Sequence, residues 1–80
     1  MEEQFDRNNL ITKAILKGFT LDEVARVFSL TRQRARQIML RVIRKIDPVL
    51  AKKSLKEIRG YKNRLITAIN NMERQYYATR

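Results

Sequence analysis

Apolar residues recur along this chain at the three- and four-residue spacing of amphipathic helices, and no stretch alternates as a strand does. Helices are predicted at residues 6–17, 21–28 and 32–46. The positions expected to face inward are Leu10, Ile11, Ala14 and Ile15, then Val24, Ala25, Val27 and Phe28, then Ala35, Ile38, Met39, Val42 and Ile46. Because only two glycines and one proline interrupt the pattern, we expect an all-α fold, a single small helical domain.

The boundaries between these helices carry their own signals. Gly18 is suited to end the first helix, because glycine tolerates the left-handed conformation of a C-cap. Thr20 and Glu23 have the spacing of a capping box, and Thr31 is placed to cap the third helix. Leu30 is expected to fill the angle between the second and third helices. This order of cap, short helix, tight turn and second capped helix is the layout of a helix-turn-helix.

At these residues the chain is similar to a known family. Residues 18–38 resemble the region 4 helix-turn-helix of bacterial primary-type sigma factors. Their sequence is Gly-Phe-Thr-Leu-Asp-Glu-Val-Ala-Arg-Val-Phe-Ser-Leu-Thr-Arg-Gln-Arg-Ala-Arg-Gln-Ile. The similarity runs without gaps over about residues 10–48, and the family's Ala-Leu-Arg-Lys-Leu-like stretch is echoed at residues 42–46. The resemblance implies binding of double-stranded DNA at the upstream, minus-35-type promoter element and docking on the flap of the RNA polymerase β subunit.

The resemblance also assigns individual residues. Arg32 and Gln37 match the family's base-contacting positions, and arginine and glutamine are suited to read guanine and adenine in the major groove. Gln33 stands where the family has a glutamate, which predicts a changed or relaxed base preference. The candidate base-contacting residues are Arg32, Gln33, Arg36 and Gln37, and the candidate phosphate-contacting residues are Thr20, Thr31, Arg34, Arg41, Lys45, Lys52 and Lys53.

Charge supports a polyanionic partner. The chain has 18 Lys and Arg against 8 Asp and Glu, a formal net charge of +10. Nearly all of this excess lies between Arg32 and Arg64, so the basic surface is expected to coincide with the motif. Binding to DNA should then weaken steeply as salt is added.

Composition also argues against several function classes. The chain has no Cys and no His, and therefore lacks thiolate ligands, disulfides and the commonest general base. Without a glycine-rich phosphate loop or a cluster of oxygen ligands, we expect no enzyme activity, no metal, no cofactor and no small-molecule substrate. The acidic start and the short apolar runs are unlike a signal peptide or a membrane span. We therefore expect a cytoplasmic location, in a bacterial cell or a phage-infected host.

Residues 48–80 lie outside the resemblance and are treated as a second segment after a DNA-binding head at residues 1–47. They predict one long helix, or two with a break near Gly60. A coiled-coil-like seam with alternating four- and three-residue spacing runs through Ala51, Leu55, Ile58, Lys62, Leu65, Ile69, Met72 and Tyr76. Three uses fit this seam: folding back on the head, forming a homodimer, or docking on a partner such as RNA polymerase. The candidate interface residues are Leu55, Ile58, Leu65, Ile69, Met72 and Tyr76.

The sequence therefore favours a small bacterial or phage transcription regulator that reads duplex DNA and contacts RNA polymerase. Two alternatives stay open. In the first, the chain mimics region 4 as an anti-sigma or polymerase-appropriating factor, and its DNA surface is secondary. In the second, it is the region 4 subunit of a split sigma factor. The strand-opening function of sigma factors is not expected from this chain, because its few aromatic residues do not form an aromatic-rich domain.

Overall fold

The computed structural model describes residues 2–79 as an all-α domain of five α-helices and one short 3-10 helix, without strands in that range. The α-helices are α1 (Glu2–Leu16), α2 (Leu21–Val27), α3 (Arg32–Ile46), α4 (Leu55–Arg59) and α5 (Lys62–Ala78), and the 3-10 helix η1 spans Leu50–Lys52. Met1, the first residue of the predicted segment 1–47, and Arg80, the last residue of the predicted segment 48–80, lie outside the described residues.

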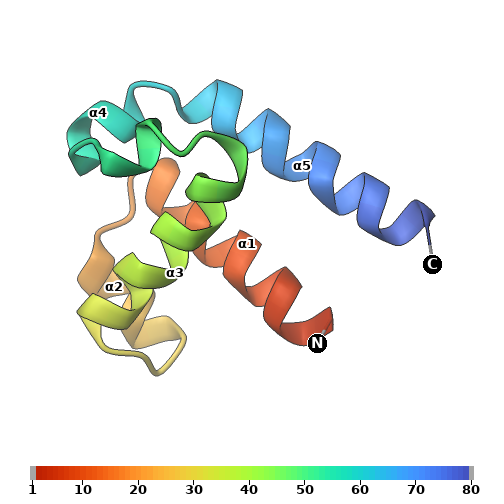
Figure 1. Cartoon of the computed structure of the whole chain (residues 1–80). Helices are drawn as coiled ribbons and strands as arrows, with labels where there is room; N and C mark the ends of the chain where they lie inside the picture. The colour runs from red at the N-terminus through yellow and green to blue at the C-terminus, as the bar shows by residue number, and fades with distance from the viewer. Residues whose placement is uncertain (1, 80) are drawn as a thin grey trace.

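Helix α3 is the centre of the packing (Figure 1), with contacts to α1, α2, η1 and α5. Its strong amphipathic pattern explains this position, because one face is apolar along its whole length. The buried cluster takes residues from every helix and from η1: Ile11, Ile15, Leu16, Leu21, Val24, Ile38, Met39, Val42, Ile43, Leu50, Ile58, Leu65 and Ile69. Both predicted segments therefore share one hydrophobic core.

Local signals set the helix ends much as the sequence predicts. Helix α3 has the predicted bounds, and α2 ends one residue early, with Phe28 as its C-cap. Gly18 has a φ of +117°, and the N–H groups of Gly18 and Phe19 donate to the carbonyls of Ile15 (3.1 Å) and Ala14 (3.2 Å). This is the Schellman arrangement that a C-terminal glycine favours. Helix α1 is longer than predicted, because it begins at Glu2.

Two of the residues expected to face inward are in fact exposed. Leu10 is 56% exposed and Val27 is 76% exposed. On α1 the buried face is instead turned toward α3 and α5, so that Asn9, Thr12 and Leu16 are buried together with the predicted Ile11 and Ile15. The periodicity of a short helix fits more than one choice of face, and the packing of α5 decides between them.

The C-terminal segment folds back on the other helices. Helix α4 ends at Arg59 and α5 begins at Lys62, so the chain breaks at Gly60 and the predicted seam is not carried by one continuous helix. Ile58, Leu65 and Ile69 are fully buried in the common core, whereas Leu55, Met72 and Tyr76 are half-buried. In this fold the three buried side chains face the chain's own helices, and the use of the seam as a homodimer interface would require the core to open.

Polar and aromatic contacts hold α5 against α1. Lys13 Nζ forms an ion pair with Glu73 (2.6 Å) and donates to Asn70 Oδ1 (2.8 Å). The N-terminal end of α1 and the C-terminal end of α5 lie on the same side of the molecule (Figure 1). Near these ends the rings of Phe5 and Tyr76 stack, with their centroids 4.3 Å apart. The Tyr77 hydroxyl donates to a carboxylate oxygen of Asp6, and this hydrogen bond raises the pKa of Tyr77 to about 12.

Candidate nucleic-acid interface

The candidate interface is built on α2 and α3 and begins with the capping box of α2. The Thr20 hydroxyl accepts from the Glu23 N–H (3.0 Å), and the Glu23 carboxylate accepts from the Thr20 N–H (2.9 Å). These hydrogen bonds, first that from the backbone of Thr20, hold the pKa of Glu23 below its ordinary value. The box fixes the start of α2, and Leu21 and Val24 then bury its inner face.

A tight turn sets the angle between α2 and α3. Ser29 adopts a φ of +56°, the left-handed region that residues with a Cβ seldom enter. Its N–H donates to Arg26 O (3.3 Å), and the Leu30 N–H donates to Ala25 O (2.8 Å). Leu30 is half-buried against the core, as predicted. The Thr31 hydroxyl then accepts from the Arg34 N–H (3.0 Å) and caps α3.

The four candidate base-contacting residues all lie exposed in the first turns of α3: Arg32, Gln33, Arg36 and Gln37. Behind them Ala35, Ile38 and Met39 are buried, so the backbone of this stretch is held against the core. None of the four exposed side chains forms a hydrogen bond or an ion pair with any residue in the described range. Their donors and acceptors are therefore available to a partner.

The candidate phosphate-contacting residues are more spread out. Thr20 and Thr31 are exposed caps, Arg34 is half-buried, and Arg41, Lys45, Lys52 and Lys53 are exposed. With about 100° of rotation per residue, Arg41 and Lys45 project from a different flank of α3 than Arg32 and Arg36. Lys52 and Lys53 follow the C-terminal end of α3, in and just after η1. The structure therefore brings together the base candidates, but it does not gather all the phosphate candidates on one face.

Helical geometry adds a residue that the sequence reasoning missed. Arg44 is exposed. It lies four residues after Leu40 and seven residues after Gln37, which is about two helical turns, so it shares a face of α3 with Gln33 and Gln37. Its charge is unpaired within the described range, where the ion pairs are Lys13–Glu73 and Arg64–Asp47. The spacing alone was enough to identify it.

Two further residues support the interface from outside α2 and α3. Arg59 of α4 donates from Nε to Ile15 O (3.0 Å) and from Nη2 to Phe19 O (2.8 Å), and so holds the turn before α2. Asp47 accepts from the N–H groups of Val49 and Leu50 (3.1 Å each) and from Arg64 Nη2 (3.1 Å). The hydrogen bond from Leu50 is the main reason that the pKa of Asp47 lies below its ordinary value. The contacts of Arg59 and the contact between Asp47 and Arg64 could not be read from local sequence, because they join distant segments, whereas the hydrogen bonds of Asp47 with Val49 and Leu50 are local.

No family model, curated protein or solved structure matched this chain in the three comparisons with known proteins. Among the described residues, no helix combines the length and apolar character needed to cross a lipid bilayer. The same range holds no group of three or more His, Cys, Asp or Glu side chains able to bind a metal ion.

Proposed function

We propose that this chain is a small bacterial or phage transcription regulator that binds duplex DNA through a sigma region 4-like helix-turn-helix formed by α2 and α3. The observation that carries the proposal is the exposed and unpaired set of Arg32, Gln33, Arg36 and Gln37 at the start of a helix whose opposite face is buried. Residues in this position reach the floor of the major groove, where arginine and glutamine pair with base edges.

The charge distribution supports the same proposal. The exposed basic residues of α3 and η1 would meet phosphates on both sides of the groove, and the net charge of +10 would attract DNA over a longer range. Gln33 replaces the glutamate of the sigma family, so we expect a preferred site that differs from the usual upstream promoter element.

Selection from a random duplex DNA pool at physiological salt tests the proposal. The wild-type chain should enrich one motif, and the double variant Arg32→Ala, Gln37→Ala should enrich none. The matched control is Arg74→Ala, Asn71→Ala, which removes one charge and one amide from exposed positions of α5. That control should enrich the wild-type motif. If both double variants behave alike, or the wild type enriches nothing, base reading by α3 is wrong.

A second candidate function, contact with RNA polymerase in the manner of a region 4 mimic, is favoured by an apolar groove beside α2. The groove has a volume of about 250 Å³ and is lined by Ala14, Phe19, Glu23, Val24, Val27 and Phe28. Phe19 is 55% exposed and Val27 is 76% exposed, which is unusual for side chains of this kind so close together. The family resemblance names the occupant, an apolar segment of the β-subunit flap.

Binding of the chain to purified core RNA polymerase separates the two functions. Val27→Asp places a charge in the groove and should abolish polymerase binding while leaving DNA binding intact. Val49→Asp adds the same charge at another exposed valine, 67% exposed, and should have no effect on the polymerase. Equal binding by all three proteins would rule out the groove as the contact. Polymerase binding without motif selection would make the mimic the main function.

A further inference from the structure

Helix α5 begins without the local signals that start the helices before it. Helices α2, α3 and α4 each follow a Thr or Ser whose hydroxyl accepts from the backbone N–H three residues on. At the start of α5 this position is held by Tyr61, which makes no side-chain capping bond, and the first turn has no acidic residue. It begins instead with Lys62, whose charge is unfavourable at the positive end of a helix dipole. Local sequence therefore does not favour a helix that starts here.

The break between α4 and α5 is also small. Gly60 has a φ of −61° and a ψ of −21°, in the right-handed helical region, so it does not use the left-handed conformation that Gly18 adopts. Of the two linking residues, Tyr61 alone leaves the helical region, with a φ of −108° and a ψ of 23°. Its ring is 50% exposed. A rotation at this one residue would join α4 and α5 into a single helix over residues 55–78.

The apolar seam keeps its register through the break. The alternating spacing of three and four residues runs from Leu55 and Ile58 of α4, through Lys62, to Leu65 and Ile69 of α5. Two separate helices joined by a bend need no common register, whereas one helix with a single apolar face does. Capping, backbone and periodicity thus all describe one continuous helix, which is bent because α5 packs on the head.

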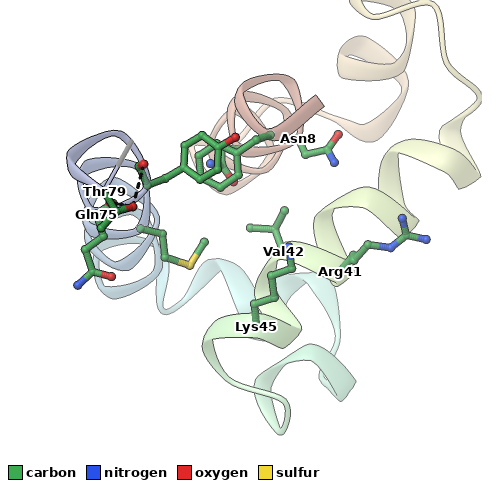
Figure 2. Close-up of a pocket in the computed structure, with 10 residues that line it drawn as sticks. Asn8, Arg41, Val42, Lys45, Gln75 and Thr79 are labelled. Atoms are coloured by element: carbon green, nitrogen blue, oxygen red, sulfur yellow. Dashed lines mark hydrogen bonds between the residues drawn. The ribbon is translucent and has the colours of Figure 1, made fainter. Parts of the chain in front are cut away.

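The seat of α5 is formed by α1 and α3. Leu65 and Ile69, near the start of α5, are fully buried in the common core. Further along the packing is more open, because a groove of about 540 Å³ lies between α1, α3 and α5. Figure 2 shows this groove with Val42 on α3 and Thr79 on α5 along two of its sides. The same seat on a second copy of the chain offers α5 identical contacts.

We infer that the chain forms a domain-swapped dimer, in which residues 55–78 are one straight helix and each α5 packs on α1 and α3 of the other copy. Opening the monomer alone would expose Leu65 and Ile69, but exchange buries them again and remakes the ion pair of Lys13 with Glu73 between the copies. A two-residue hinge favours such exchange. The dimer does not depend on DNA binding.

Charge reversal in two separate chains tests the exchange. Lys13→Glu and Glu73→Lys each place like charges where α1 meets α5 in the folded-back monomer. In a swapped dimer of one chain of each kind, both seats pair opposite charges. The two are refolded together, one isotope-labelled, and native mass spectrometry should find mixed dimers above the statistical share.

The control is a chain that carries both reversals, refolded with the wild type. Its own pair is restored, but a swapped dimer with the wild type brings like charges together at both seats. Mixed dimers should then fall below the statistical share. Statistical shares in both mixtures would show a dimer without exchange, and monomers in both would show none; either result overturns the inference.

Hinge variants should move the equilibrium in opposite directions. A Cβ at Gly60 would lie 3.1 Å from Glu57 O in the bent chain, and alanine suits a helix interior. Gly60→Ala should therefore lower the dimer dissociation constant about tenfold in sedimentation equilibrium. Lys62→Pro is tolerated at the first position of α5 but breaks a continuous helix, so it should stay monomeric, whereas Lys62→Gln should dimerise as the wild type does. Equal dissociation constants for Gly60→Ala and the wild type would overturn the inference, whether or not the proline variant folds.

Discussion

At the scale of single residues, Ser29 is the position where the backbone departs most from what its side chain prefers. Its φ of +56° lies in the left-handed region, which costs a residue with a Cβ about 1–2 kcal/mol. The surrounding hydrogen bonds, from the Ser29 N–H to Arg26 O and from the Leu30 N–H to Ala25 O, hold it there. The turn between α2 and α3 therefore stores strain that a glycine would relieve.

We expect Ser29→Gly to raise the free energy of unfolding by about 0.5–1 kcal/mol. This is the relief of backbone strain in the folded state minus the cost of the greater conformational entropy that glycine gives the unfolded chain. Urea denaturation measures this as a higher midpoint with an unchanged slope. Ser29→Ala is the control, because it removes the hydroxyl but keeps the Cβ and the strain. A gain with alanine equal to that with glycine would show that the hydroxyl, rather than the backbone, is unfavourable.

At the scale of helices, Arg59 joins α4 to the C-terminal end of α1. Its guanidinium donates to Ile15 O and Phe19 O, carbonyls at the negative end of the α1 dipole and in the turn that follows. A hydrogen bond from a charged group contributes about 1.5–3 kcal/mol to the free energy of unfolding. The contribution is smaller where water can replace the lost partner. Arg59 is half-buried, so part of this contribution should remain.

Arg59→Met keeps the apolar stem but removes both donors, and should lower the free energy of unfolding by about 1–3 kcal/mol. Arg59→Lys should recover only part of this stability, because one ammonium cannot reproduce the fork of a guanidinium. Chemical denaturation of the three proteins gives the comparison. If the methionine variant is as stable as the wild type, α4 is held by Leu55 and Ile58 alone.

Asp47 makes the connection from α3 to η1 and α5 sensitive to acid. Its ordinary pKa is 3.8, and in the fold the hydrogen bond from the Leu50 N–H lowers it, followed by the contact with Arg64. The unfolded chain therefore binds this proton more readily than the folded one. The stability that Asp47 contributes is present above pH 3.8 and is lost as the pH falls through the folded pKa.

We expect Asp47→Asn to lower the melting temperature at neutral pH, and the difference from wild type to shrink as the pH is reduced below 3.8. Thermal unfolding followed by circular dichroism over this pH range is the measurement. Asp22→Asn, at an exposed position of α2 and outside these contacts, is the control for loss of a negative charge. A difference between wild type and Asp47→Asn that stays constant with pH would mean that the charge of Asp47 is not involved.

The helices also show which parts of the fold can be predicted from sequence. The bounds of α3 follow from local signals, because Thr31 caps its start and Pro48 disfavours a helical conformation at Asp47, which is the C-cap. The exposure of Leu10 and Val27 could not be foreseen, because it depends on which face of α1 and α2 is covered by distant helices. For residues 48–80 the sequence left open one long helix or two with a break near Gly60, and the second alternative is confirmed, because α4 ends at Arg59 and α5 begins at Lys62.

At the scale of the whole molecule, the same division separates the exposed face of α3 from the groove between α1, α3 and α5. The exposed face of α3 lies within one helix, so spacing alone predicts that Arg32, Gln33, Arg36 and Gln37 share a surface. The groove with Asn9 needs α1, α3 and α5 to converge, and nothing local in sequence marks Asn9 as buried. Arg41 and Lys45, predicted to contact phosphates, line the edge of this groove, on a different flank of α3 from Arg32 and Arg36.

The net charge of +10 makes salt dependence the measurement that distinguishes specific phosphate binding from general attraction. Removing one side chain that neutralises a phosphate should reduce the slope of log affinity against log salt by roughly 0.9. If Lys52 and Lys53 bind phosphates, their joint replacement by alanine should lower the slope by about twice that amount and leave the selected motif unchanged. Lys62→Ala, Arg74→Ala removes the same charge from exposed positions of α5 and should change the slope far less. Equal slopes for the two double variants would mean that η1 contributes only to the overall field, and that the proposed DNA-binding surface ends with α3.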